Sequence, residues 1–129
     1  MVVDSSALLA ILLQEPEAAA ISLTLSQAHP RRLSAANFVE TSMVVEARNS
    51  DAGIRELDTL IRRAAIEIVA VDEAQALLAR EAFRHYGKGR HKAGLNFGDC
   101  FAYALAKSLG EPLLCKGGDF RLTDIAVVN

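Results

Sequence analysis

Short apolar runs, separated by helical patterns, constrain the fold of this chain most strongly. Val2 and Val3 precede Asp4, a residue type that often caps a helix, and residues 7–13 continue with good helix formers. Further strand patterns are predicted at 31–34, 66–71, 112–115 and 125–128. Strands that alternate with helices are typical of α/β proteins with a mainly parallel sheet. We therefore predict a three-layer α/β/α sandwich with a mainly parallel central sheet.

The remaining helices follow from apolar periodicity and from capping residues. They are expected at 16–28, 37–48, 51–64, 72–85 and 98–110. A length of 129 residues is about that of one domain, and the chain shows no internal repeat or linker. We therefore predict a single domain over residues 1–129.

Composition and hydropathy indicate whether such a domain crosses a membrane. The chain is 51% hydrophobic and has a mean hydropathy of +0.20, yet no apolar run approaches the ~20 residues of a membrane span. We expect part of this apolar excess to lie in a partner interface. No basic segment precedes the apolar stretch 7–13, as it would in a signal peptide, so a cytoplasmic protein without membrane contact is predicted.

Charge and metal-ligand patterns exclude several function classes. The formal net charge of −2 argues against binding of nucleic acid by bulk electrostatics. Cys100 and Cys115 are too far apart for a C-x-x-C motif and are predicted to be buried thiols. The three histidines lack zinc-ligand spacing, which argues against a zinc site.

Three acidic residues stand at positions that face a core. Asp4 follows the first strand, and Asp99 lies at the start of a helix whose face carries small and aromatic residues. On its helix, Glu40 is expected on an apolar stripe with Val44 and Ala47. A buried carboxylate needs a cation, a metal or a raised pKa. Helix capping alone would also explain Asp4 and Asp99.

Taken together, the acids favour a site for a hard cation. Carboxylate oxygens suit Mg²⁺ or Mn²⁺, whereas Zn²⁺ prefers sulfur and nitrogen ligands. Asp119, in the turn 116–119, and Asp124 are further acids near the expected sheet end.

Several segments resemble those of PIN-domain proteins, and in particular the VapC-type toxin ribonucleases of bacterial toxin–antitoxin pairs. The resemblance spans the whole chain. It rests on VVDSSAL at 2–8, NFVE at 37–40, YGKGRH at 86–91, LNFGDC at 95–100, KGGDF at 116–120 and TDI at 123–125.

This resemblance implies a single PIN-like domain and a Mg²⁺-dependent endoribonuclease, with Mn²⁺ as the alternative ion. It implies that Asp4, Glu40 and Asp99 are metal ligands and that Ser6 is a supporting hydroxyl. Asp119 is the expected fourth acid, although similar proteins often carry an acidic or amide residue at Gly118 as well. If Asp119 only caps the turn, the site has three acids.

The resemblance also implies the partners. These are an RNA substrate, a second copy in a homodimer, and a cognate VapB-type antitoxin that neutralises the toxin. Operator DNA would be bound only through the antitoxin, because this chain shows no DNA-binding motif.

A basic loop offers a candidate RNA contact. Lys88, Arg90 and Lys92 follow Arg84 with no acidic residue between them, and Gly87 and Gly89 would allow close approach of a phosphate. The alternative is a solvated flexible loop.

Two other functions compete with the nuclease. The first is a phosphoryl-transfer domain with a strand-end aspartate nucleophile. It would require a second acid two residues after Asp4, and Ser6 occupies that position. The other is a non-catalytic dimeric interaction module in which the acids are structural caps.

Overall fold

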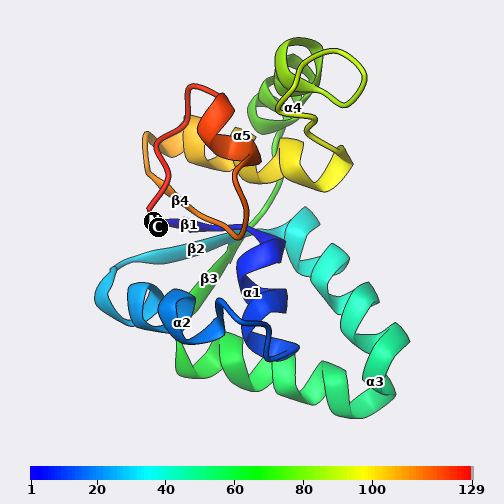
Figure 1. Ribbon diagram of the computed structural model, residues 1–129, viewed down its shortest axis with the longest axis vertical. Helices are drawn as coiled ribbons and strands as arrows, with labels where there is room; N and C mark the ends of the chain where they lie inside the picture. The colour runs from blue at the N-terminus through cyan, green and yellow to red at the C-terminus, as the bar shows by residue number, and fades with distance from the viewer. Residues whose placement is uncertain (129) are drawn as a thin grey trace.

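The computed structural model describes residues 1–128. Its centre is a four-stranded sheet of β1 (Val2–Val3), β2 (Arg31–Ser34), β3 (Ile66–Val69) and β4 (Leu113–Leu114), in the order β3-β2-β1-β4 (Figure 1). All pairings are parallel, and Val2 lies opposite both Arg32 and Leu113. The predicted parallel sheet is therefore confirmed.

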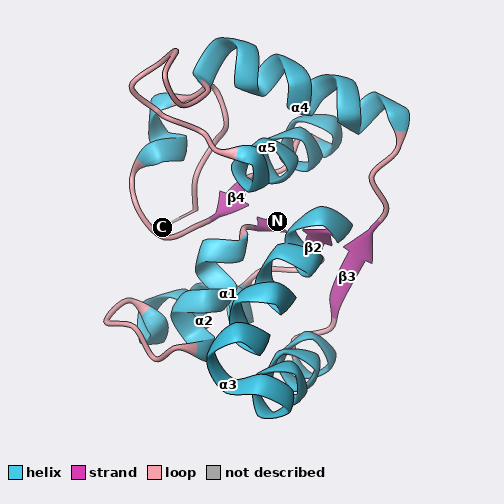
Figure 2. Ribbon diagram, turned by 90° about the vertical axis from the view of Figure 1, so that its right-hand side faces the viewer, coloured by secondary structure: helices cyan, strands magenta, loops and turns pink. Residues whose placement is uncertain are grey.

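Helices cover both faces of this sheet. They are α1 (Ser5–Leu12), α2 (Ala18–Gln27), α3 (Ala35–Arg63), α4 (Glu73–Tyr86), α5 (Phe97–Leu109) and the 3-10 helix η1 (Asp119–Leu122). Helices α4 and α5 lie on one side of the strands and α1, α2 and α3 on the other (Figure 2). This arrangement confirms the predicted three-layer sandwich.

The core has two halves because side chains alternate along a strand. Val2 packs into the half under α4 and α5, whereas Val3 packs into the half under α1 to α3. Both side chains are fully buried. The predicted burial of Cys100 and Cys115 as free thiols is also confirmed.

Several elements differ from those predicted. Helix α2 starts two residues after Pro16, and the two helices expected at 37–48 and 51–64 join in α3 across a break at Asn49 and Ser50. The predicted strand 125–128 is wrong, because only a single bridge pairs Val127 with Leu113. Among residues 1–128, no helix is long and apolar enough to cross a membrane.

Candidate active site

Asp4 lies at the carboxyl end of β1 and is the N-cap of α1. The residue is only 3% exposed. Oδ2 accepts hydrogen bonds from the Ser6 amide at 3.0 Å and from the Ser6 hydroxyl at 2.6 Å. The other oxygen, Oδ1, is buried and has no hydrogen-bond partner in the part of the chain that the structure describes. The cap thus uses one carboxylate oxygen and leaves the second available.

Ser6 connects Asp4 to the loop that follows β4. Its hydroxyl accepts a hydrogen bond from the Lys116 amide at 2.9 Å while it donates to Asp4. Ser6 therefore joins the start of α1 to the loop after β4, and its role in catalysis stays a prediction.

Glu40 lies in the first turns of α3 and is half-buried. Its Oε1 accepts hydrogen bonds from the Ser5 hydroxyl and, at 3.3 Å, from Asn37 Nδ2. The buried stripe of this part of α3 contains Asn37, Thr41 and Val45, whereas Ala47 is exposed. The apolar stripe expected around Glu40 is therefore not the buried face, and Ser5 and Asn37 supply hydrogen bonds to one oxygen of its carboxylate.

Asp99 stands in the first turn of α5 and is also half-buried. It forms a capping box with Asn96: Asp99 Oδ2 accepts from the Asn96 amide, and Asn96 Oδ1 accepts from the Asp99 amide, both at 2.9 Å. The capping role that the sequence left open is therefore real. It does not exclude a further role, since a carboxylate has more than one acceptor position.

The charges of these acids act on the pKa values of Asp4 and Asp99. Burial raises the pKa of Asp4 from 3.8 to about 7, and the nearby charges of Asp99 and Glu40 add to the rise while the Ser6 hydrogen bonds oppose it. Burial also raises the pKa of Asp99, with further contributions from Glu40 and Asp119. Like-charged groups at close range disfavour joint ionisation unless a cation compensates.

The donor set fits a hard divalent cation. It offers carboxylate oxygens, and Asp4 Oδ1 is buried without a hydrogen-bond partner among the described residues 1–128. Within residues 1–128, no three acidic, histidine or cysteine side chains converge closely enough to hold an ion as they stand. Glu40 is engaged by Ser5 and Asn37, and Asp99 by Asn96.

The later acids occupy different environments. Asp119 is the first residue of η1, is exposed, and lies near enough to Asp99 to affect its pKa. Asp124 accepts hydrogen bonds from the Tyr103 hydroxyl and from Lys107 Nζ, both at 2.6 Å. Asp124 therefore has a structural pairing of its own, which agrees with leaving it out of the predicted site.

The basic loop between α4 and α5 exposes Lys88, Arg90 and Lys92. Its main chain is closed by hydrogen bonds, including Lys88 N to Leu95 O and Leu95 N to Tyr86 O, both at 2.9 Å. The guanidinium of Arg90 lies 5.4 Å from the centre of the Phe83 ring. The loop thus exposes three positively charged side chains, and hydrogen bonds hold its main chain in place.

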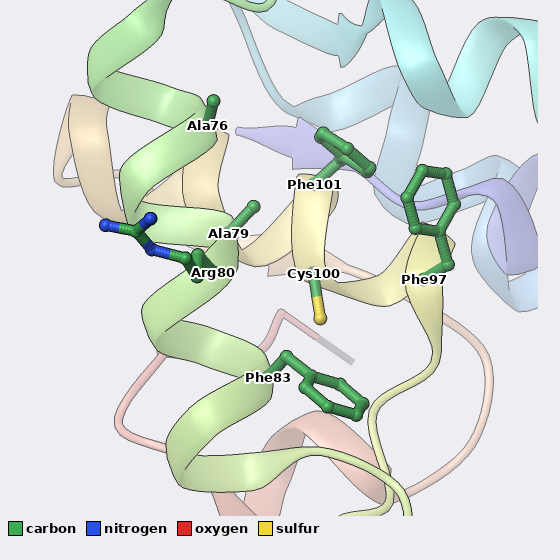
Figure 3. A pocket seen from close by; sticks show the side chains of 7 residues that line it. All are labelled: Ala76, Ala79, Arg80, Phe83, Phe97, Cys100 and Phe101. Carbon is green, nitrogen blue, oxygen red and sulfur yellow. The ribbon is translucent and has the colours of Figure 1, made fainter.

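An apolar groove runs between α4 and α5. It has a volume of about 450 Å³, and Figure 3 shows the side chains that line it. Phe97, two residues before Asp99, is 79% exposed and contacts Phe101 with ring centres 4.9 Å apart. An exposed aromatic surface of this kind is typical of an interaction site.

Three residues of the site were missed as contacts by sequence reasoning. Ser5 and Asn37 hydrogen-bond to Glu40, and Gly98 packs against it. Asn37 precedes Glu40 by three residues, one turn of a helix, and this spacing was the available signal. Ser5 and Gly98 come from other elements, and nothing in their local sequence indicates the contact.

Proteins of a known family are similar to this chain over nearly its whole length. The model of the PIN domain family matches residues 1–126. A ribonuclease VapC of Mycolicibacterium smegmatis is 54% identical over 129 residues, which are 100% of both chains. The chain belongs to the PIN-domain family of VapC ribonucleases.

Solved structures share the fold at low sequence identity. VapC20 of Mycobacterium tuberculosis, described as a Sarcin-Ricin loop cleaving toxin, has a TM-score of 0.81 at 16% identity, covering 99% of this chain and 98% of its own. VapBC2 of Rickettsia felis, solved bound to a DNA fragment from the promoter, has a TM-score of 0.76 at 14% identity and covers 99% and 96%. The PIN-domain VapC fold is therefore confirmed.

Proposed function

We propose that this protein is a Mg²⁺-dependent endoribonuclease toxin of a toxin–antitoxin pair. The observation that carries the proposal is that Asp4 Oδ1 is buried without a hydrogen-bond partner in residues 1–128, while the charges of Glu40 and Asp99 act on Asp4. A structural cap explains Asp4 Oδ2 but leaves Oδ1 without a function, because burial of an unsatisfied carboxylate oxygen is costly. The nuclease therefore accounts for more of the site than the interaction module does.

The carboxylates would have different roles in binding the ion. Asp4 and Asp99 would bind it directly, and Glu40 would bind it or one of its waters. When bound, Mg²⁺ would lower the pKa of a coordinated water and offset charge on the phosphate being cleaved. Ser6 holds the Asp4 carboxylate in place through Oδ2. Asp119 would be the fourth acid, and its charge contributes to the raised pKa of Asp99.

The substrate we propose is RNA in a single-stranded segment or loop. Such segments expose their backbone and bases, so a phosphodiester can reach carboxylates at the edge of a sheet. Lys88, Arg90 and Lys92 would contact neighbouring phosphates, since their side chains are exposed on a loop that leads into α5.

The partners we propose are a VapB-type antitoxin and a second copy of this chain. The groove supports the antitoxin, because it exposes an apolar surface on which Phe97 and Cys100, close to Asp99 in the sequence, lie (Figure 3). Further exposed apolar side chains, among them Val39 and Met43 beside Glu40, offer surface for a homodimer. DNA would be bound only through the antitoxin.

Cleavage of total RNA tests the activity. The wild-type protein with Mg²⁺ should cut RNA, and EDTA or the Asp99→Asn variant should stop it, because Asn keeps the cap but removes the charge. Asp124→Asn is the matched control, since Asp124 is paired with Tyr103 and Lys107 instead. Equal cleavage by wild type and Asp99→Asn would contradict the assignment.

A further inference from the structure

The carboxylate of Glu40 is held between three residues from three different elements, which we term the Glu40 seat: Ser5 of α1, Asn37 of α3 and Gly98 of α5. The Ser5 hydroxyl and Asn37 Nδ2 both donate to the same oxygen, Glu40 Oε1. Asn37 Nδ2 also donates to the carbonyl of Gly98 at 2.9 Å. The seat therefore ties the position of Glu40 to the starts of α1 and α5, where the other acids lie.

Gly98 supplies the space for the carboxylate. A Cβ built at this position would overlap both Glu40 oxygens and would lie 2.5 Å from Glu40 Cδ. Gly98 is helical and has no left-handed backbone conformation, so its φ does not require glycine. The absence of a side chain at this position is explained by the close approach of Glu40.

Asn37 is the link between the helices. It is fully buried, although asparagine is a residue type usually exposed. Its main-chain carbonyl accepts from the Ser5 hydroxyl at 3.3 Å and from the Thr41 hydroxyl at 2.8 Å. Its side-chain Nδ2 donates to Glu40 and to the Gly98 carbonyl, whereas Oδ1 is buried without a hydrogen-bond partner among residues 1–128. The two bonds of Nδ2 therefore link Glu40 to the start of α5.

We propose that Ser5, Asn37 and Gly98 are positioning residues that hold Glu40 in the place from which it serves the divalent cation. This inference rests on the proposed function. A free glutamate side chain samples several rotamers and loses conformational entropy when an ion fixes it in one. Because the seat already selects one rotamer, binding of the ion costs less entropy. The seat acts through Glu40 and does not touch the substrate.

Gly98→Ala is the sharpest variant, because the group in collision is the far end of a flexible side chain. Glu40 can turn away at little cost to folding, while alanine is the better helix former. We expect an unchanged or raised melting temperature together with Mn²⁺ binding weakened about 10–100-fold by calorimetry. Gly118→Ala is the matched control, since nothing lies within 4 Å of a Cβ there, and it should keep the wild-type affinity.

Ser5→Ala tests the hydrogen-bonding side of the seat. It should also weaken Mn²⁺ binding, by a smaller factor, because Asn37 still holds Glu40. Ser42→Ala removes a hydroxyl from the same region of α3, where Ser42 donates to the Phe38 carbonyl at 2.7 Å. That control should leave the affinity unchanged.

A double-mutant cycle with Glu40→Gln shows whether Gly98 acts through Glu40. If it does, Gly98→Ala should have little further effect on Mn²⁺ affinity in the Glu40→Gln background. Effects of the two substitutions that multiply fully would overturn the proposal. So would a Gly98→Ala protein that binds Mn²⁺ as tightly as the wild type.

A measurement on the metal-free protein separates this inference from the proposed function. The side-chain carboxyl ¹³C resonance of Glu40, assigned by its loss in Glu40→Gln, should shift in Gly98→Ala and Ser5→Ala but not in Gly118→Ala. An unshifted resonance would overturn the seat whether or not the protein binds a metal. A wild type that binds no Mn²⁺ and cuts no RNA would overturn the proposed function, and with it the role of the seat.

Discussion

The Ser6 hydroxyl donates a hydrogen bond to Asp4 Oδ2 at 2.6 Å, and the Ser6 amide donates to the same oxygen at 3.0 Å. Two donors from one residue hold this carboxylate oxygen, so the free oxygen of Asp4 keeps a fixed direction. The Lys116 amide in turn fixes the Ser6 hydroxyl. Asp4 is therefore oriented by both α1 and the loop after β4.

Ser6→Ala should lower RNA cleavage by about 10–100-fold, the usual effect of removing a group that orients a metal ligand. It should also destabilise the fold by about 1–3 kcal/mol, because a buried carboxylate oxygen and an amide each lose a partner. Cleavage rates and denaturant unfolding measure the two effects separately. The Ser42→Ala protein, which loses a hydroxyl bonded only within α3, should retain full activity.

The metal-free protein should lose stability as pH rises. Burial raises the pKa of Asp4 from 3.8 to about 7, so between these values the folded state binds a proton that the unfolded state has released. The free energy of unfolding therefore falls by up to about 1.4 kcal/mol per pH unit in this window, and the loss is complete above pH 7.

Unfolding in EDTA from pH 4 to pH 8 tests this slope. Asp4→Asn should flatten it and should be more stable than the wild type at pH 8, because asparagine also caps helices but carries no charge. A wild type that gains stability across the same range would contradict the raised pKa.

At neutral pH, divalent ions should offset the loss of stability that ionised Asp4 causes. A ligand that binds only the folded state at 100 times its Kd adds about 2.7 kcal/mol, which should raise the melting temperature of the wild type by several degrees. The rise with Mn²⁺ should vanish in Asp4→Asn and persist in Asp124→Asn, whose side chain is paired elsewhere. The absence of any rise in the wild type would favour a non-catalytic interaction module.

The sequence predicted the architecture well because its signals are local. Val2 and Val3 before Asp4 indicated a strand, a cap and a helix, and the structure has all three. The strand expected at 125–128 was wrong, because apolar and β-branched residues there lack the neighbouring pairings that make a strand. Pairing depends on the sheet edge, which local sequence does not describe.

The site was predicted only in part for the same reason. The acids stood out because a carboxylate among apolar residues is unusual, and their charges do share one field. The sequence does not predict the hydrogen bonds that Ser5 and Asn37 donate to Glu40. Ser5 lies 35 residues from Glu40 in the chain, so this contact follows from packing of α1 against α3.

Phe97→Ser should weaken binding of the antitoxin without destabilising the toxin. Phe97 is 79% exposed, so removal of its ring takes little from the core. At an interface, loss of a central aromatic residue often costs 2 kcal/mol or more, about a 30-fold weaker Kd. Calorimetric titration with the purified antitoxin measures the change, and Leu23→Ser, at another exposed apolar residue on α2, is the control. Equal weakening by both would argue against the groove as the docking site.

Alanine at Lys88, Arg90 and Lys92 together should raise the KM for RNA and leave kcat nearly unchanged. These side chains are exposed, and we expect them to neutralise phosphates remote from the bond that is cut. Removal of three contacts to a single strand should reduce the slope of log KM against log salt by about two.

The matched control removes the same charge from the other side of the sheet. Arg55, Arg62 and Arg63 are exposed in the second half of α3, in the layer opposite the basic loop (Figure 2). Their replacement by alanine should change KM and its salt dependence much less. A similar loss in both triple variants would mean that net charge attracts the RNA, whereas a loss of kcat alone in the loop variant would place the loop in the chemical step.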